Sequence, residues 1–417
     1  MRRLVWILAT AACSAASGRA QTVLNWSQVE ARFRAANPTL QAGQINIDES
    51  KAAEITAYLK PNPDLTVAVD QLQPFTGSPY RPLTGAFPSY AMGYLHERQH
   101  KRELRLESAQ DATTISISQQ EDLIRTLIYA LRNAFVQTLQ AKAVLALARD
   151  NLAYFDREAA ISRDRLRSGD IAQLDLNRIE LQRVQYESDF QTATVSMRTA
   201  KIQLLQLLND RTTAVDRFDV EGTFDFSDNL APLEAFRAHA AVARPDLQAA
   251  VQTVTKAQTD HKLAVANGST DPTFGLDIAH NPPFNIYIGV NVNIPLRIFD
   301  RNQGEKLRTQ LDITHAQRAR EAAEAQVYSD VDSAYVTVAS TIELLKPYRD
   351  KYLKLARDVR DTTEYSYQRG QAALVDYLDA QRDYRATYVT YLNLVGSYLT
   401  AASQLDLAVG SEVIPIK

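Results

Sequence analysis

The sequence predicts a mainly α-helical protein with a small β part, in which long antiparallel coiled-coil helices carry four strands per chain. Long stretches contain neither glycine nor proline, from Tyr94 to Ser168, from Asp170 to Glu221 and from Glu305 to Lys346. Four short segments elsewhere alternate apolar with polar residues, which is typical of a strand with one apolar and one polar face. Similar phrases recur in the two halves of the chain, so these elements are expected twice.

The helices are expected to be rods rather than parts of a globular core. A continuous helix from about His100 to Arg167 would be on the order of 100 Å long, since each residue adds about 1.5 Å. Apolar residues recur every three or four positions, as at Leu123 and Leu127, which is the spacing of coiled-coil packing. Gly169 and Gly370 interrupt two such rods at matching places. Each rod is therefore expected to fold back on a second one.

Three pairs of phrases define the duplication. NPTLQA at 37–42 recurs as RPDLQA at 244–249, NPDL at 62–65 recurs as DPTF at 271–274, and RSG at 167–169 recurs as QRG at 368–370. The expected segments are a signal peptide (1–20), a first repeat (21–209), a linker (210–243), a second repeat (244–410) and a C-terminal tail (411–417).

Each repeat is expected to run helix, strand, strand, long helix, returning helix. The first helices are expected at Val23–Leu59 and Leu233–Ala266, the first strands at 65–70 and 274–279, the second strands at Ser89–Leu95 and Phe284–Ile294, and the turns between strands at Gln73–Pro88 and Asn281–Pro283. Both turns contain the proline, glycine or asparagine that hairpin turns need.

The strands have the length and the two faces of strands that cross a membrane. They number about 7 to 12 residues each, close to the roughly 9–11 that a tilted strand needs to cross a bilayer. Since open sheet edges are not tolerated in lipid and the smallest single-chain barrels have eight strands, four strands cannot close alone. A dimer would supply eight strands and a trimer twelve, and only the larger barrel leaves an aqueous bore. The competing interpretation is a small soluble sandwich that caps the helices.

Bulk properties and the N-terminus narrow the class of protein. The net charge of −3 gives no electrostatic basis for nucleic-acid binding, and a mean hydropathy of −0.28 argues against a polytopic helical membrane protein. Arg2 and Arg3, followed by an apolar run from Leu4 to Ala16, predict a secretory signal cleaved after Ala20. Cys13 leaves lipoprotein processing as the alternative; without it the mature chain has no cysteine.

One motif suggests a different chemistry. His96-Glu97-Arg98-Gln99-His100 matches the H-E-x-x-H pattern, in which two histidines on one helical turn bind zinc and the glutamate acts as a base. The pentapeptide lies where a strand is expected to end and a helix to begin, and it has no apolar helical context. No other catalytic constellation and no cofactor-binding motif occurs in the sequence, so an enzyme is not expected.

The whole mature chain resembles the TolC-type outer-membrane efflux factors. The resemblance lies in the phrases NPTLQAG and RPDLQAA at the start of the halves, in IPLRIFDRNQG after the second hairpin, and in a glycine followed six residues later by aspartate before each returning helix, at Gly370 and Asp376 and at Gly169 and Asp175. The phrase IPLRIFDRNQG is more similar to the heavy-metal-efflux branch of this family than to its drug branch.

The resemblance implies a homotrimer with a twelve-stranded barrel in the outer membrane and an α-helical tunnel in the periplasm. It implies a passive exit duct for a tripartite efflux or type I secretion-like system, with a periplasmic adaptor and an inner-membrane pump of the RND or ABC type. The alternatives are a soluble periplasmic coiled-coil scaffold and a zinc protease with the H-E-x-x-H motif.

The resemblance also implies roles for individual residues. Acidic residues at the positions of Asp376 and Asp379, with Tyr367, form the periplasmic constriction of the family, where a ring of carboxylates would retard cations. Ala372 stands where the best-studied members carry a basic tethering residue. The tips that would contact the adaptor are Arg167, Ser168, Gly169, Asp170, Arg369, Gly370 and Gln371. The face that would meet outer-membrane lipid is Phe284, Ile286, Ile288, Val290, Val292 and Ile294.

Overall fold

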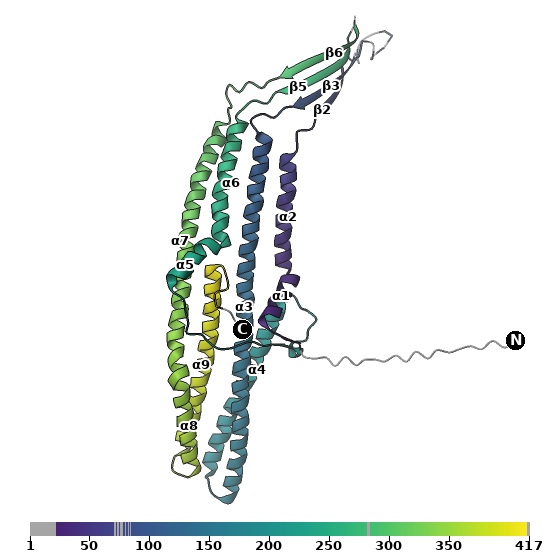
Figure 1. The fold of residues 1–417 in the computed structure, drawn as a ribbon. Coiled ribbons are helices and arrows are strands. Elements are labelled where there is room, and N and C mark those ends of the chain that lie inside the picture. Colours follow the sequence, from purple (N-terminus) through teal and green to yellow (C-terminus); the bar gives the residue numbers. More distant parts are fainter. Residues whose placement is uncertain are drawn as a thin grey trace, which may run out of the picture.

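The protein is an elongated layer of long helices with one small sheet at its end (Figure 1). The computed structural model describes residues 22–414 except 71, 73, 74, 76, 77, 80, 82, 84, 282 and 283. The expected signal peptide, its cleavage after Ala20 and Cys13 lie outside the described residues, as do residues 415–417 of the tail.

The predicted order of elements is present in both halves. The first half contains α1 (Trp26–Ala36), α2 (Pro38–Tyr58), β2 (Asp64–Asp70), β3 (Phe87–Leu95), α3 (Lys101–Ser168) and α4 (Gln173–Leu207). The second half contains α5 (Leu233–Ala243), α6 (Pro245–Asn267), β5 (Thr273–Asn281), β6 (Phe284–Asn293), α7 (Gln303–Pro347), α8 (Leu353–Gln368) and α9 (Leu374–Val409). A π-helical stretch, Tyr348–Tyr352, joins α7 to α8.

The long rod is confirmed: α3 is a single helix of 68 residues that ends at Gly169. In Figure 1, α2 and α4 lie one above the other along one flank of α3, and α6 and α9 do the same along the other flank. The combined length of α7 and α8 borders α6 and α9 on their far side. Two long rods and two stacked pairs therefore make up the layer.

The single first helix expected in each half is wrong, because proline breaks it. Asn37 and Arg244 are extended, with φ/ψ of −76°/117° and −74°/119°, and the following prolines begin α2 and α6. A proline lacks the N–H that a helix interior needs and forces the preceding residue out of the helical region. At the first position of a new helix, the same residue costs nothing.

These breaks are the joints at which helices stack end to end. The Asn37 side chain accepts the N–H groups of Thr39 and Leu40 and donates to the last carbonyl of α4, Leu207, at 3.5 Å. At the second joint, Arg244 donates to the carbonyl of Ala408 at the end of α9, at 3.2 Å. The repeated NP and RP phrases thus connect the end of a lower helix to the start of an upper one.

The main core lies at the level of these joints. Its fully buried side chains come from distant parts of the chain, with Phe33, Phe135, Leu204, Val331 and Leu405 among them. A short parallel pair of strands that the sequence did not predict, β1 (Thr22–Leu24) and β4 (Phe218–Val220), borders this core. Both strands have only three residues, too few to show an alternating pattern.

A buried ionic cluster joins α3 to the C-terminal segment in this region. The Arg132 side chain is 5% exposed and pairs with Asp406 and Glu412. The other oxygen of Asp406 accepts the backbone N–H groups of Val413 and Ile414, at 2.8 and 3.1 Å. Burial raises the pKa of Asp406 to about 6, although Arg132 acts in the opposite direction.

The four longer strands form one antiparallel sheet in the order β2-β3-β5-β6. The pairing of β3 with β5 joins the hairpins of the two halves. Strands β2 and β6 occupy the outer positions and each has one edge without a partner strand in the described chain. One copy of the chain therefore leaves two open edges.

Candidate channel wall and periplasmic tip

Most of the large apolar residues of the four strands lie on one face of the sheet, in matching rows. One row runs Leu65, Met92, Leu276, Val290 and a second runs Val67, Tyr90, Ile278, Ile288. These side chains are 40% to 84% exposed. A continuous apolar surface of this kind is unusual on a protein face that meets water.

The structure places the predicted lipid-facing residues as follows. Strand β6 begins at Phe284, whose side chain lies outside the described part, and Ile294 comes directly after the strand. The exposed fractions are 71% for Ile286, 69% for Ile288, 84% for Val290, 55% for Val292 and 55% for Ile294.

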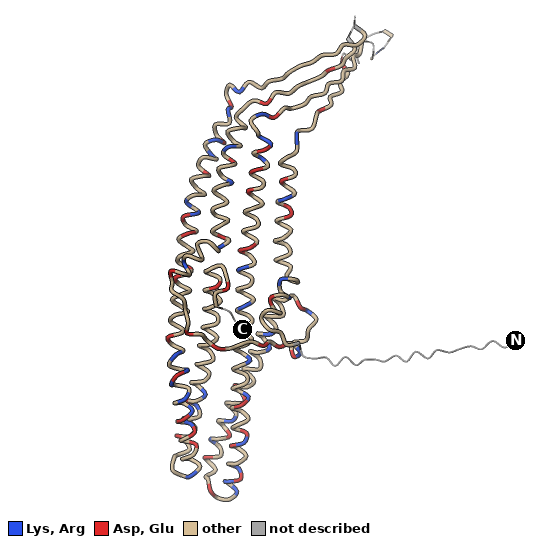
Figure 2. Tube along the Cα trace, in the orientation of Figure 1, with Lys and Arg blue, Asp and Glu red and all other residues tan. Residues whose placement is uncertain are grey.

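The opposite face of the sheet is polar and its only charges are negative. Asp277 accepts a hydrogen bond from Asn291 at 3.3 Å, on the neighbouring strand. Both side chains lie over glycines, since a Cβ atom on Gly275 would approach Asn291 to 2.4 Å and one on Gly289 would approach Asp277 to 2.5 Å. Figure 2 shows that the strands carry few charged residues, and none of the residues in β2, β3, β5 and β6 is lysine or arginine.

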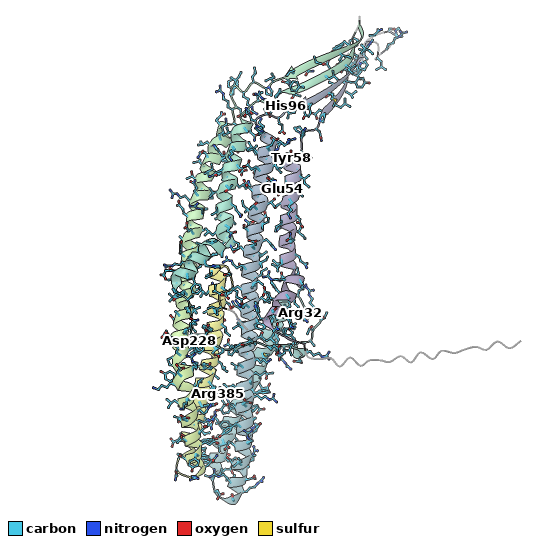
Figure 3. The ribbon with its side chains drawn as sticks, in the orientation of Figure 1. Arg32, Glu54, Tyr58, His96, Asp228 and Arg385 are labelled. Carbon is cyan, nitrogen blue, oxygen red and sulfur yellow. The ribbon has the colours of Figure 1, made fainter. Side chains whose placement is uncertain are left out.

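The H-E-x-x-H pentapeptide forms the crossing from β3 to α3 and is not helical. Figure 3 shows His96 at the base of the sheet. Gln99 and His100 have φ of 59° and 54°, so the two histidines are not one helical turn apart. Glu97 makes a two-pronged ion pair with Arg105, with Nη2 to Oε2 at 2.9 Å. The glutamate therefore serves as a structural partner, which argues against the zinc-protease interpretation.

This crossing is fixed by a second ion pair to the other half of the chain. Lys101 is 4% exposed, and its ammonium group donates to Asp271 at 2.5 Å and to the carbonyl of Ser269 at 3.0 Å. Asp271 also accepts the N–H of Arg98 at 2.9 Å. Lys101 and these hydrogen bonds lower the pKa of Asp271, although burial acts in the opposite direction.

The two predicted periplasmic tips have the same backbone structure. Gly169 and Gly370 have φ of 83° and 75°, a left-handed conformation that favours glycine. The N–H of Asp170 donates to Arg165 at 2.8 Å, and the N–H of Gln371 donates to Ser366 at 2.8 Å. Each helix thus ends in a Schellman-type turn, and the two tips lie side by side at the lower end in Figure 1.

The remaining predicted tip residues are exposed and make mostly local contacts. Ser168 donates to Asp170 at 2.9 Å, and Arg167 pairs with Asp164 at 3.0 Å while remaining 79% exposed. The guanidinium of Arg369 lies 4.1 Å from the centre of the Tyr365 ring. These tips therefore present both charges to solvent.

Above the tips, a cluster of tyrosines that the sequence did not reveal connects the helical hairpin α3/α4 to the helical hairpin α8/α9. The hydroxyls of Tyr154 on α3 and Tyr377 on α9 are 2.7 Å apart. Gln381 donates to the Tyr154 hydroxyl at 3.1 Å. Tyr367 stacks on Tyr377 with centroids 4.9 Å apart and an interplanar angle of 12°. Burial raises the pKa of Tyr154 and of Tyr377, so both hydroxyls stay protonated.

An acidic pair lies beside this cluster. Burial and the carboxylate of Glu364 raise the pKa of Glu158, while Arg165 and Arg157 lower it. The Arg165 guanidinium also lies 5.6 Å from the centre of the Tyr367 ring. Charged groups from two helices, α3 and α8, therefore converge on the tyrosines.

Asp376 and Asp379 lie on the exposed side of α9, and both already have partners. Asp376 accepts the N–H of Ala373 at 3.3 Å and so stabilises the first turn of the helix. Asp379 pairs with Arg382 at 3.2 Å and is 51% exposed. The predicted constriction residues thus fall into two groups, with Tyr367 in the tyrosine cluster and the two aspartates outside it.

We expect Tyr154→Phe to loosen the contact between the hairpins. It leaves the buried Tyr377 hydroxyl without its partner, at a cost of about 1–3 kcal/mol. Hydrogen–deuterium exchange over residues 154–170 and 365–381 should become faster. Tyr365→Phe is the matched control, because Tyr365 is 52% exposed. Equal exchange in the two variants would contradict a connecting role for Tyr154.

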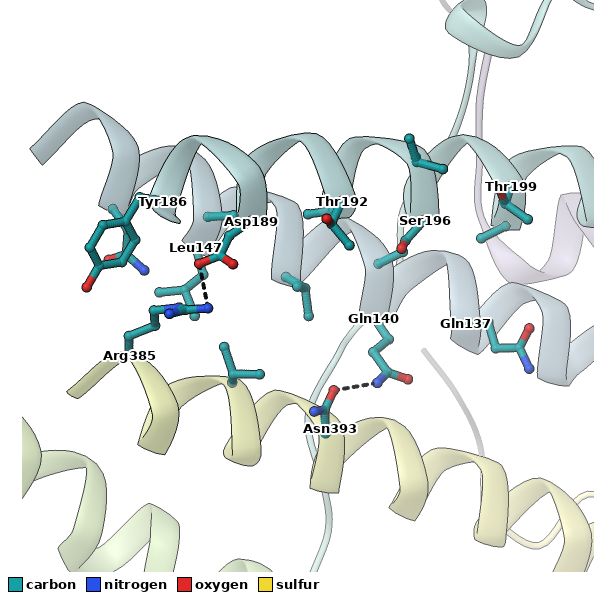
Figure 4. Close-up of a pocket in the computed structure, with 18 of the residues that line it drawn as sticks. Gln137, Gln140, Leu147, Tyr186, Asp189, Thr192, Ser196, Thr199, Arg385 and Asn393 are labelled. Atoms are coloured by element: carbon teal, nitrogen blue, oxygen red, sulfur yellow. Dashed lines mark hydrogen bonds and ion pairs between the residues drawn. The ribbon is translucent and has the colours of Figure 1, made fainter. Parts of the chain in front are cut away.

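A cleft of about 610 Å³ lies higher up between α3, α4 and α9 (Figure 4). Two polar contacts join its walls, from Gln140 to Asn393 at 2.9 Å and from Arg385 to Asp189 at 2.5 Å. The Arg385 guanidinium also lies 5.4 Å from the centre of the Tyr186 ring. These contacts hold α9 against the α3/α4 hairpin along its length.

Among the residues described here, no α-helix has both the length and the apolar character that a bilayer crossing requires.

Comparisons with known proteins agree with this architecture. Residues 231–411 match the profile of the family described as outer membrane efflux protein. The cobalt-zinc-cadmium resistance protein CzcC of Cupriavidus metallidurans is 21% identical over 381 residues, which cover 90% of this chain and 87% of that protein.

Solved structures share the fold along nearly the whole chain. The MtrE outer membrane channel of Neisseria gonorrhoeae, in its open state, has a TM-score of 0.75 at 16% identity, with 96% of this chain and 94% of that chain covered. The outer membrane protein VceC of Vibrio cholerae has a TM-score of 0.72 at 14% identity, with 92% and 96% covered. Residues 231–411 therefore match the outer membrane efflux protein family, and nearly the whole chain has the fold of these outer membrane proteins.

Proposed function

We propose that three copies of the chain form the outer-membrane duct of a tripartite efflux system, with the sheet as one third of a twelve-stranded barrel. The observation that carries this proposal is the four-stranded sheet with one exposed apolar face and two unpaired edges. In lipid those edges must be paired, so β6 of one copy would pair with β2 of the next. A repeated head-to-tail contact of this kind closes into a ring.

The helical layer supports the same ring. Its two outer flanks both expose large apolar side chains. On α4 these are Leu174, Leu181, Val184, Val195 and Ile202, and on α7 and α8 they are Val336, Leu344, Leu355 and Val359. Burying one flank against the other in a neighbouring copy would remove both from water. The helices would then line a periplasmic tunnel below the barrel.

In this arrangement the lower end of the helical layer would contain the gate and the surface that contacts the adaptor. The exposed tips around Gly169 and Gly370 would meet a periplasmic adaptor, and an inner-membrane pump of the RND or ABC type would deliver the cargo. Asp376 and Asp379 would form an acidic ring at the constriction, while the tyrosine cluster would hold the two hairpins of each copy together. Domain boundaries at 21–209, 210–243 and 244–410 follow from the same repeat.

We propose a cationic cargo, with divalent metal ions as the first candidates. The polar face of the sheet, which would line the bore, carries Asp64, Asp70 and Asp277 and no positive charge on its strands. A wall of one sign concentrates the opposite sign of ion. The matching relative CzcC is a cobalt-zinc-cadmium resistance protein, and the phrase IPLRIFDRNQG resembles the heavy-metal branch. Loss of the gene should then lower tolerance to such ions.

The assembly is tested by membrane fractionation and inter-chain crosslinking. Val67→Cys combined in turn with Ile286→Cys, Ile288→Cys and Val290→Cys should give a disulfide-linked trimer in the outer membrane in at least one pairing. Val67→Cys alone is the control and should stay monomeric on a denaturing gel. Recovery of the protein in the soluble periplasm, as expected of a coiled-coil scaffold, would refute the proposal.

The gate is tested in planar bilayers. Asp376→Asn combined with Asp379→Asn should weaken the block by divalent cations about tenfold or more, because six fixed charges leave the constriction of the trimer. Asp358→Asn is a control, since this aspartate lies higher on α8. An unchanged block would remove the two aspartates from the constriction.

A further inference from the structure

The crossing from β6 to α7, residues 294–302, exposes an unusual group of large apolar side chains. Leu296 is 78% exposed, Ile298 is 62% exposed and Phe299 is 90% exposed. The equivalent crossing in the first half, residues 96–100, contains no large apolar residue. The apolar group is therefore a property of this one crossing and not a requirement of the repeated fold.

Despite its exposure, the segment is held in a defined shape. The Thr270 hydroxyl donates to the Pro295 carbonyl at 3.1 Å, and the N–H of Ile298 donates to the Leu296 carbonyl at 3.0 Å. Gln303 closes the next turn by donating to the Phe299 carbonyl at 3.1 Å. Asn302 attaches the whole segment to α6 through the carbonyl of Ala264 at 2.8 Å. The apolar side chains are thus presented on a braced loop.

The segment continues the apolar face of the sheet. Val290 and Val292 on β6 are 84% and 55% exposed, and Ile294 leads directly from them into the loop. If that face meets the hydrocarbon of the membrane, the loop comes at its periplasmic border. Large apolar residues mixed with arginine are typical of segments that lie in the headgroup layer.

Two arginines in this loop indicate the chemical group that it would bind. Arg297 lies between Leu296 and Ile298, and Arg301 follows Phe299 and Asp300. Figure 2 shows positive charge where β6 passes into α7. Within the described ranges, neither guanidinium forms an ion pair with a carboxylate, in contrast to Arg308 on α7, which pairs with both Glu305 and Asp312. A free guanidinium matches the geometry of a phosphate and binds it through two hydrogen bonds.

We propose that residues 294–302 bind phospholipid in the inner leaflet of the outer membrane, with Leu296, Ile298 and Phe299 among the upper acyl chains and Arg297 and Arg301 on headgroup phosphates. This proposal rests on the proposed membrane-spanning sheet. It adds a lipid anchor beside the barrel, at the level where strands give way to helices. The competing occupant of the loop is a neighbouring copy, whose Tyr58 and Leu59 at the end of α2 are also exposed.

The test uses tryptophan emission in vesicles of brominated phospholipid. Trp26, which is 9% exposed in the core, is the one tryptophan expected after signal cleavage and gives the background. In Phe299→Trp, the added tryptophan should lose about half of its emission, because bromine quenches only at close range in the interface. In Val290→Trp, quenching reports the membrane-spanning sheet alone.

The outcomes separate the two proposals. Quenching in Val290→Trp without quenching in Phe299→Trp would overturn the lipid anchor and leave the barrel standing, and a blue-shifted, unquenched emission in Phe299→Trp would assign the loop to the neighbouring copy. Absence of quenching in both would refute the spanning sheet.

The arginines are tested by the choice of lipid. In the Phe299→Trp background, brominated phosphatidylglycerol should quench more strongly than brominated phosphatidylcholine. Arg297→Gln with Arg301→Gln should abolish that preference, and Arg308→Gln should retain it, because Arg308 already pairs with acidic side chains. A preference that survives the double substitution would remove the arginines from the site.

Discussion

Val290→Arg is expected to keep the protein out of the outer membrane. Val290 is 84% exposed and lies in the row that crosses all four strands through Leu276, Met92 and Leu65. A positive charge on the lipid face of a barrel costs about 2–4 kcal/mol near the middle of the bilayer, and a ring of three chains incurs this cost at three places. The amount of protein in the outer-membrane fraction measures the effect.

The control is Asn291→Arg, on the next residue of the same strand. Its side chain projects from the opposite face, where a charge would meet water in the bore, so this variant should reach the outer membrane. Equal accumulation of the two variants would contradict the assignment of the two faces. A failure of both would point to a general intolerance of β6 toward arginine.

Arg132→Met is expected to destabilise the folded protein by about 3–5 kcal/mol, because it leaves the buried carboxylate of Asp406 without its cation. Trp26 reports this directly, since the Arg132 guanidinium lies 5.3 Å from the centre of its ring. Thermal unfolding followed by Trp26 fluorescence is the measurement. Arg318→Met is the matched control: Arg318 is 75% exposed in its pair with Glu321, and such a surface pair contributes about 0–1 kcal/mol.

The pH dependence of this effect has a defined sign. Burial raises the pKa of Asp406 to about 6 in the folded protein, above the value of about 4 expected in an unfolded chain. Its protonation therefore stabilises the fold below about pH 4, and this contribution is lost as the pH rises through about 6. Removing Arg132 raises that pKa further, so the deficit of Arg132→Met should be larger at pH 8 than at pH 5. A deficit that does not change with pH would contradict the role of Asp406.

The elements could be predicted because their patterns are local. Alternation marked the strands, as at Phe274 and Leu276, and the absence of glycine and proline before Gly169 marked the end of a 68-residue helix. The joints show the limit of this approach. Asn37 and Pro38 were visible as a repeated phrase, but their partner Leu207 is 170 residues away, and only the fold brings it near.

The tyrosine cluster was missed for a similar reason. Tyr154 and Tyr377 are 223 residues apart, and an aromatic residue on the apolar stripe of a coiled coil carries no sign of its partner. Asp376 had a signal that was available, because an acidic residue three positions into a helix is a common helix-start residue. The resemblance instead implies a role for its charge at the constriction.

The stacked joints also determine how bending stiffness is distributed along the molecule. The helices α3 and α7 continue without a break past the level of the joints. In contrast, α4 and α9 end there, at Leu207 and Val409. Just below, Pro347 and the π-helical stretch Tyr348–Tyr352 interrupt the second rod, and such interruptions are where long helices kink. The α3/α4 hairpin is therefore held rigidly by the continuous helix α3. Both helices of the α8/α9 hairpin are instead connected to the layer at flexible points. A force on the tips is therefore expected to move α8 and α9 and to leave α3 in place.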